Sequence, residues 1–413
     1  GAAVLLDLGP LRRNRNFRLL YLGQMVSFLG TMVSYVAVPY QVYELTRSSM
    51  HVGLVSGAQL IPLLVFGLWG GSVADTLDRR SLLLRSEVVM TLGALALALN
   101  ARLERPSLAA IYVISFVIAA ANAFHRPAMD ALNQKLVSDA ELPAVSALLS
   151  LRGSVGAVAG PALGGWLLAR GGLSVAYGFD LATFLVALGC VFGLRDLPAL
   201  EATASPGLGG IKEGLRFARA RPELVGTYAI DIVAMTFAFP MALYPAMSER
   251  WGGEQAIGWL YAAMSTGALV VSLFSGWTRR VRRHGAAVVC AAALWGFWVA
   301  AFGLAPSLPL AFGALALAGA ADAVSGIFRM TIWNQTIPNT LRGRLAAVEM
   351  MSYLSGPLLG NARAGAIASV SSNELSVLSG GLICVVAVVV CATLLPRFWR
   401  YEAGERPGAG SQA

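Results

Sequence analysis

Two aspartates, Asp231 and Asp322, lie inside long apolar stretches of the chain, where an ionised side chain is costly. A carboxylate in surroundings of low dielectric constant can bind and release a proton near neutral pH, which is the chemistry of a proton-coupled site. A structural ion pair is the alternative, because Arg329 follows Asp322 by two helical turns. These residues therefore predict either proton coupling or a buried ion pair.

Polar residues also recur at helical spacing on one face of four apolar stretches. Polar faces inside a membrane normally line a cavity or pair with one another. Arg126 and Asp130 are four residues apart and could pair within their own helix. The aromatic members of the set suit a large, partly aromatic ligand, and the arginines suit an anionic one. The residues expected to line a substrate cavity are Gln24, Ser27, Thr31, Tyr35, Asn122, Arg126, Asp130, Tyr228, Phe239, Ser325, Arg329 and Trp333.

The elements that must position these residues are long apolar helices, and the composition indicates a membrane protein. The chain has 413 residues, of which 57% are hydrophobic and only 13% are charged, with a mean hydropathy of +0.66. A helix of about 20 apolar residues crosses the ~30 Å hydrocarbon layer of a bilayer. We therefore predict an all-α integral membrane protein with twelve transmembrane helices. Their approximate ranges are 17–45, 51–75, 81–101, 107–136, 142–170, 173–194, 223–248, 255–278, 285–305, 309–337, 343–370 and 375–396.

The basic residues orient these helices. With both termini in the cytoplasm, 22 of the 31 lysines and arginines fall in cytoplasmic segments. This asymmetry follows the positive-inside rule, so the net charge of +9 indicates orientation and not a nucleic-acid partner. Arginine far outnumbers lysine, which with the alanine and glycine content suggests a bacterial genome of high GC content. The prediction is a multi-pass protein of the bacterial cytoplasmic (inner) membrane, in contact with lipid and monomeric.

Five further ionisable residues lie in or beside the predicted helices. Asp180 is close to an outer end and is expected to make local hydrogen bonds, whereas His125 is expected to pack, although it could titrate. Glu87 and Glu349 are near inner ends and are expected to join the network of loop charges. Arg152 is deep in its helix and needs a partner that the sequence does not identify.

No pattern of enzymatic or cofactor chemistry is present in the sequence. The four cysteines all lie in apolar stretches without metal-ligand spacing, so no metal site is expected. The chain has no phosphate-binding P-loop, nucleophile elbow or dinucleotide fingerprint. We therefore expect neither an enzyme nor a bound cofactor.

A polar interruption at 195–222 divides the chain into two parts of six predicted helices each. It begins as a linker rich in proline, serine and glycine, and it ends in a basic amphipathic helix. The expected organisation is an N-terminal half at 1–194, a C-terminal half at 223–396 and a cytoplasmic tail at 397–413. The halves repeat weakly, since Gly53 and Gly71 correspond to Gly258 and Gly276 at the same offset. Repeated halves around a central cavity are a transporter architecture.

The very short loop between the second and third predicted helices contains Gly71, Asp75, Arg79 and Arg80. This order, G-x-x-x-D-x-x-x-R-R, resembles the signature between helices 2 and 3 of major facilitator superfamily transporters. The resemblance implies two pseudo-symmetric six-helix halves. It also implies a conformational latch, in which Asp75 caps or pairs with a neighbouring helix end while the arginines hold the inner surface. The alternative is a positively charged loop with an ordinary Asp–Arg pair.

The loop departs from that signature at Thr76, where a base is common, and at Asp78, where glycine is common. The corresponding segment after Gly276 keeps its basic end but has lost the acid. We therefore expect Asp75 to matter for switching, with no equivalent acid in the second half.

Small residues and one proline are closely spaced in the fifth predicted helix. Such spacing allows close helix packing, and proline bends a helix. The run resembles the glycine–proline signature of antiporters in this superfamily, except that Ala147 stands at the expected first glycine. Plain packing of membrane helices is the alternative interpretation. The residues of this antiporter-type bend are Gly156, Gly160, Pro161, Gly164 and Gly165.

Several local strings resemble bacterial enterobactin exporters and related drug-efflux proteins. The strings include VAVPYQVYELT at 36–46, PAMDALNQKLV at 127–137 and IGWLYAAMSTGA at 257–268. The resemblance implies proton-coupled export of a siderophore or similar secondary metabolite by alternating access. A multidrug or macrolide efflux transporter is the alternative. A non-transporting membrane sensor or scaffold would not need the polar cavity faces.

Overall fold

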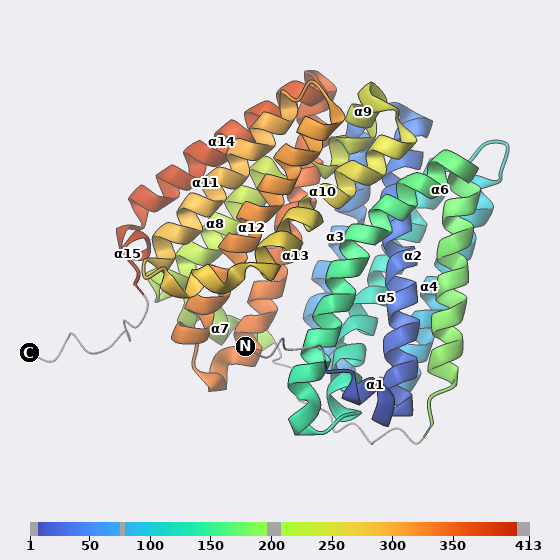
Figure 1. Ribbon diagram of the computed structural model, residues 1–413, viewed down its shortest axis with the longest axis horizontal. Coiled ribbons are helices and arrows are strands. Elements are labelled where there is room, and N and C mark those ends of the chain that lie inside the picture. Colours follow the sequence, from blue (N-terminus) through green and yellow to red (C-terminus); the bar gives the residue numbers. More distant parts are fainter. Residues whose placement is uncertain (1–6, 75–78, 196–207, 403–413) are drawn as a thin grey trace, which may run out of the picture. The chain divides into compact units, whose positions relative to one another are not determined.

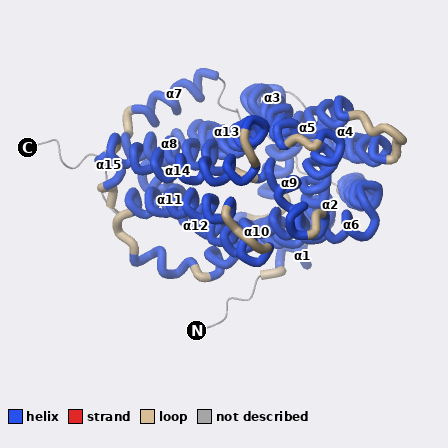
Figure 2. Tube along the Cα trace, turned by 90° about the horizontal axis from the view of Figure 1, so that it is seen from above, coloured by secondary structure: helices blue, strands red, loops and turns tan. Residues whose placement is uncertain are grey.

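The computed structural model describes residues 7–74, 79–195 and 208–402, and these residues form helices joined by short loops (Figures 1 and 2). The described part contains no β-strand. The all-α class predicted from the composition is confirmed. Many large apolar side chains are exposed on the helix surfaces, for example Leu273 and Phe274, which are 71% and 72% exposed. Exposed apolar surface of this kind belongs in contact with lipid.

Ten helical stretches among the described residues are long and apolar enough to cross a membrane. Helix α6 contains two of the predicted spans, and α13 is a further helix of 32 residues, so the prediction of twelve transmembrane helices is confirmed. The long helices are α2 (Arg15–Thr46), α3 (Ser49–Ala74), α4 (Arg79–Ala101), α5 (Leu108–Lys135), α6 (Leu142–Phe192), α8 (Pro222–Ala238), α10 (Glu254–Leu273), α11 (His284–Gly303), α12 (Leu308–Thr336), α13 (Asn339–Val370) and α14 (Asn373–Leu394).

Short elements connect or flank these helices. Helix α7 occupies the segment in which an amphipathic helix was expected, and its Phe217 and Ala218 pack against Leu224 and Ile337. The short α-helices are α1 (Gly9–Arg13), α7 (Leu208–Arg219), α9 (Tyr244–Ser248) and α15 (Pro396–Trp399). The 3-10 turns are η1 (Asp139–Glu141), η2 (Met241–Leu243), η3 (Glu249–Trp251) and η4 (Ser275–Arg280).

Gly172 makes the turn between the two membrane spans of α6. Its φ of 66° and ψ of −167° are not helical, and a residue with a Cβ rarely adopts this conformation. The helical pattern resumes immediately on both sides, so two antiparallel spans are joined almost without a loop. The predicted boundary between 170 and 173 coincides with this residue.

The predicted span at 223–248 is interrupted. Helix α8 ends at Ala238, Phe239 is extended, and Pro240 precedes the turn η2 and the short helix α9. Proline disfavours the helical conformation of the residue before it, which explains why the helix ends there. The backbone groups freed by this break find partners, since Ala242 N donates to Asn361 Oδ1 at 2.9 Å.

The chain forms two compact units. Unit 1 comprises 1–45, 61–205 and 257–262, and unit 2 comprises 46–60, 206–256 and 263–413. Unit 1 therefore includes residues 257–262 from the C-terminal part of the sequence, and unit 2 includes residues 46–60 from the N-terminal part. The boundaries of the two predicted halves remain a prediction.

In unit 1, α4 packs on α5 and α6, and α2 packs on α6. Helices α2 and α6 pack closely because α6 presents glycines to α2. A Cβ on Gly156 would lie 2.2 Å from Phe28 Cδ1, and a Cβ on Gly160 would lie 2.3 Å from Met32 Cβ. Neither helix could approach so closely with a larger residue at these positions. At one end of the unit, Phe17, Leu20, Leu83, Leu132 and Leu148 belong to a fully buried apolar core.

In unit 2, α11 packs against α8, α12 and α14, and α13 packs against α7, α8 and α14 (Figures 1 and 2). Helix α10 packs on α12 at Gly319, where a Cβ would lie 2.0 Å from Met264 O. The 46–60 segment is tied to α13 and α14 by polar contacts. Asn361 Nδ2 donates to Ser56 Oγ at 3.0 Å, and Ser49 Oγ donates to Asn373 Oδ1 at 2.7 Å.

Candidate functional site

A cluster of three charged side chains lies inside unit 2, two of them buried and the third, Asp322, with 37% of its side chain exposed. Arg329 Nη1 of α12 contacts Asp231 Oδ1 of α8, and Arg329 Nη2 lies 3.6 Å from Oδ1 of Asp322, which is two turns away on α12. The side chains of Arg329 and Asp231 are 7% and 6% exposed. The two acids that the sequence singled out therefore share one guanidinium.

Aromatic contacts fix the relative positions of α8 and α12 beside this cluster. Trp333 Nε1 donates to Thr227 Oγ1 at 2.9 Å, and the Trp333 ring stacks on Tyr228 with 5.7 Å between ring centres. Trp333 is one turn from Arg329 and Tyr228 is one turn from Asp231, so these contacts hold the charged residues at a fixed separation.

A small cavity of about 10 Å³ adjoins the cluster, lined by Asp231, Asp322, Ser325, Met235 and Trp295 among others. This volume is about what one water molecule needs. Phe239, expected in the cavity, is instead 9% exposed and stacks on Trp295 at 6.3 Å. Ser325 is buried and lines this small cavity, while its predicted role in binding a substrate stays a prediction.

Two hydrogen-bond donors beside the cavity have no partner in the described part of the chain. They are Trp295 Nε1 and Arg329 Nε. Buried donors without partners are costly, and at a transport site they are available to a polar ligand or to water.

Charge counting shows what the cluster can do. With both carboxylates ionised and Arg329 protonated, the cluster has a net charge of −1. Binding one proton makes it neutral, which low-dielectric surroundings favour. The geometry therefore combines both interpretations of the sequence: the acids form an ion pair with Arg329, and one carboxylate is in excess.

The polar face predicted for the first span lies on α2 in unit 1, with its members in different environments. Ser27 is buried and accepts a hydrogen bond from Thr31 Oγ1 through its carbonyl at 3.0 Å. Gln24 Nε2 is buried without a hydrogen-bond partner among the described residues. Tyr35 is 43% exposed and makes an edge contact with Tyr261 of α10, which belongs to the same unit.

The polar face of α5 is only partly described. Asn122 and Arg126 are exposed, and their place in a substrate cavity stays a prediction. The side chain of Asp130 lies outside the described residues, so its pairing with Arg126 stays a prediction. Phe124 packs on Phe66 of α3 with 5.3 Å between ring centres.

A second buried ionisable pair lies in unit 1, where the sequence did not predict one. His125 Nε2 of α5 lies 2.7 Å from Glu87 Oε2 of α4, and their side chains are 8% and 1% exposed. The assignment of Glu87 to the loop charges was wrong, because its carboxylate turns toward α5. The signal was available in part: an acid and a histidine both lie well inside adjacent apolar helices.

The other predicted groups have the following positions. Asp180 of α6 accepts a hydrogen bond from Ser34 Oγ of α2, as expected of a residue that makes local hydrogen bonds. Pro161 is buried within a continuous helical stretch of α6. Gly164 and Gly165 are buried in the same stretch, and Gly165 Cα would lie 2.8 Å from a Cβ on Gly258. The glycine run is thus a packing face, and its link to antiport stays a prediction.

The predicted latch is not described in atomic detail. Gly71 lies in α3, and Arg79 and Arg80 begin α4, but their side chains lie outside the described residues, as does Asp75 entirely. Among the described residues no group of histidine, cysteine, aspartate and glutamate could hold a metal ion.

Comparisons with known proteins agree with this architecture. The family model described as transmembrane secretion effector matches residues 6–405. The enterobactin exporter EntS of Shigella boydii serotype 18 is 31% identical over 408 residues, covering 96% of each chain.

Two solved structures have the same fold. A bacterial homologue of the iron transporter ferroportin, in an inward-facing state, matches with a TM-score of 0.70 and 15% identity, over 93% of this chain and 98% of the other. The peptide transporter POT matches with a TM-score of 0.75 and 10% identity, over 94% and 96%. The chain is therefore a multi-pass membrane transporter, not an enzyme, and it belongs to the transmembrane secretion effector family of the major facilitator superfamily.

Proposed function

We propose that this protein exports a siderophore or a related secondary metabolite across the bacterial cytoplasmic membrane in exchange for protons. The substrate class is supported by the relative that is named an enterobactin exporter and that matches almost the whole chain. The exchange with protons is supported by one observation above all, the excess carboxylate in the Asp231–Arg329–Asp322 cluster, in which Asp231 and Arg329 are buried.

In the proposed cycle, alternating access exposes the substrate site first to the cytoplasm and then to the outside. A proton from outside neutralises the cluster, and its release to the cytoplasm restores the full attraction of both carboxylates for Arg329. Since each ligand biases the same conformational equilibrium, proton binding and substrate binding are coupled. The unpartnered Trp295 Nε1 and Arg329 Nε would donate to polar groups of the substrate. Arg329 also suits a substrate with negative charge.

The proposed orientation places both termini in the cytoplasm, because most lysines and arginines then lie on the cytoplasmic side. The protein acts as a monomer in this scheme, and all the residues of the proton site come from one unit of one chain.

Transport into inverted membrane vesicles tests this proposal. An imposed pH gradient should drive siderophore uptake, and Asp231→Asn or Asp322→Asn should abolish the response to the gradient. Glu374→Gln is the matched control, because Glu374 is a half-exposed acid paired with Arg250 at 3.3 Å. Uptake that ignores the gradient, or that both Asp→Asn variants leave intact, would refute proton coupling.

The substrate class needs its own measurement. Purified protein should unfold at a higher temperature when a catecholate siderophore is present, since a ligand that binds only the folded state stabilises it. Macrolide antibiotics form the comparison series. Stabilisation by macrolides and not by siderophores would favour the drug-efflux alternative and overturn the proposed substrate.

A further inference from the structure

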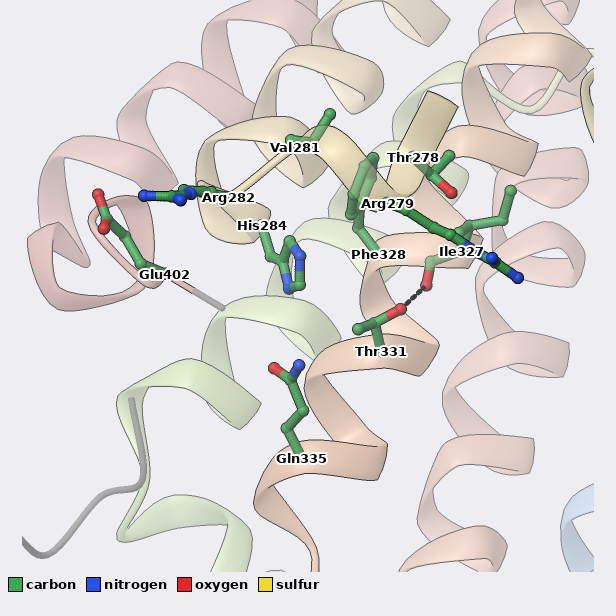
Figure 3. Close-up of a pocket in the computed structure, with 10 residues that line it drawn as sticks. All are labelled: Thr278, Arg279, Val281, Arg282, His284, Ile327, Phe328, Thr331, Gln335 and Glu402. Carbon is green, nitrogen blue, oxygen red and sulfur yellow. Dashed lines mark hydrogen bonds between the residues drawn. The ribbon is translucent and has the colours of Figure 1, made fainter. Parts of the chain in front are cut away.

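A second cavity of about 610 Å³ lies at one end of unit 2, and none of its lining residues lines the small cavity of the proton site (Figure 3). It is open to one side and is lined by the turn η4 and the segment after it, the start of α11, the second half of α12 and Glu402, three residues beyond the end of α15. Small-molecule sites in proteins commonly have volumes of roughly 300–1,000 Å³. Its polar lining consists of Thr278, Arg279, Arg282, His284, Thr331, Gln335 and one acid, Glu402.

Positive charge is concentrated around this cavity without matching negative charge. Four arginines, Arg279, Arg280, Arg282 and Arg283, precede α11 within five residues. Among the described residues, only Arg283 has a carboxylate within 4 Å, with its Nε 3.2 Å from Glu402 Oε1. The four guanidinium groups are therefore balanced by a single carboxylate.

The start of α11 adds to this positive field. Its first turn contains no acidic residue, and the N-cap residue Arg283 makes no side-chain capping hydrogen bond. The N-terminal end of a helix has a partial positive charge and normally attracts anions. Arginines and a histidine at this end are unfavourable unless an anion offsets them.

His284 is the most informative residue in the lining. The residue is only 5% exposed; its imidazole interacts with the backbone of Val281, and its Nδ1 has no side-chain hydrogen-bond partner in the described part of the chain. Packing on Phe328, with 5.3 Å between ring centres, fixes the imidazole, which points toward Thr331 and Gln335 (Figure 3). Gln335 Oε1 accepts from Tyr401 Oη at 3.1 Å, so the amide nitrogen of Gln335 is the group left to donate.

The repeated sequence explains how the excess charge arose. At the offset of 205 residues that relates Gly71 to Gly276, Asp75 corresponds to Arg280 and Asp78 to Arg283. Both acids of the first loop are thus arginines in the second. The second loop has lost its internal counter-charges, and the one acid that pairs with it, Glu402, leaves an excess of positive charge that an anion can offset.

We propose that this cavity binds a phosphate group, held by Arg279 and Arg282 with donors from His284 and Gln335. Arginine is suited to phosphate because its planar guanidinium donates two parallel hydrogen bonds. The cavity adjoins a membrane-spanning helix, so the phosphate can belong to an anionic phospholipid headgroup or to a soluble phosphate compound. Basic pockets between membrane helices bind phospholipid headgroups in this way.

The test measures the unfolding temperature of the purified full-length protein in a neutral detergent. One arm adds phosphatidylglycerol, with phosphatidylcholine as the comparison lipid. The other arm adds inorganic phosphate, with chloride at the same ionic strength. Stabilisation by phosphatidylglycerol alone identifies a lipid headgroup, and stabilisation by inorganic phosphate as well identifies a soluble phosphate compound.

Two double variants of equal charge make the test specific. Arg279→Gln/Arg282→Gln removes two arginines of the cavity and should weaken binding roughly tenfold or more. Arg280→Gln/Arg397→Gln removes two exposed arginines that do not line the cavity, and it should bind as the unchanged protein does. Equal losses in both variants, or no stabilisation by either phosphate source, would overturn the proposal. Because the measurement does not involve transport, its outcome is independent of the proposed function.

Discussion

His125 Nε2 and Glu87 Oε2 lie 2.7 Å apart between α5 and α4, and both side chains are almost fully buried. Removing one member of such a pair leaves the other buried without its partner. We expect Glu87→Gln to lower the free energy of unfolding by about 2 kcal/mol. Thermal unfolding of the purified protein measures the change.

Glu104→Gln is the control for this prediction, since Glu104 is an exposed acid in the loop between the same two helices. It should leave the unfolding temperature unchanged. If Glu87→Gln is as stable as the control, the pair does not hold α4 against α5.

The shared guanidinium in unit 2 predicts that two substitutions compensate each other. Arg329→Gln alone leaves the buried Asp231 and the partly exposed Asp322 without a cation and should cost about 3–5 kcal/mol. Adding Asp231→Asn removes one of those charges and should recover part of the loss. A double-mutant cycle on the unfolding temperature measures the coupling, and purely additive effects would show that Arg329 and Asp231 do not interact.

The glycines of α6 that pack on α2 predict that a larger side chain there destabilises the protein, and another glycine of the same helix serves as the control. A Cβ on Gly160 would lie 2.3 Å from Met32 Cβ, so Gly160→Val should cost roughly 1–3 kcal/mol through overpacking. Gly153, two turns earlier in the same helix, has nothing within 4 Å of its Cβ position. Gly153→Val should therefore be tolerated much better, and equal melting temperatures would contradict the observed packing of α2 on α6.

A substitution in the conformational latch predicted from the sequence should affect transport but not substrate binding. Asp75→Asn should reduce transport several-fold while substrate binding, measured by ligand-induced thermal stabilisation, stays within a factor of about two. Arg280→Gln, at the corresponding place in the second loop, should leave transport nearly unchanged. A clear loss of binding in Asp75→Asn would mean that the residue does not act on switching.

The sequence predicted the helices well because membrane spans are determined by local composition. The twelve apolar runs coincide with the helices to within a few residues, and even the boundary at Gly172 was expected. The break after Ala238 was missed, although Pro240 marked it, because an apolar stretch reads as continuous whether or not the helix persists.

Side-chain partners were harder to predict because they depend on how each helix is rotated in its packing. Asp322 and Arg329 share one helix, so helical spacing suggested their contact. Asp231 reaches Arg329 from α8, and Glu87 reaches His125 from another helix, and neither contact has a local signal. Phe239 shows the same limit, since the backbone break turns its ring onto Trp295.

The single unmatched carboxylate beside Arg329 has an electrical consequence. If one proton enters for each neutral substrate that leaves, every cycle moves one positive charge inward, and the membrane potential contributes about 2.3 kcal/mol per 100 mV to export. Vesicles with equal pH on both sides should then still transport when a potassium diffusion potential is imposed. In a cell near neutral external pH, voltage would supply most of the driving force.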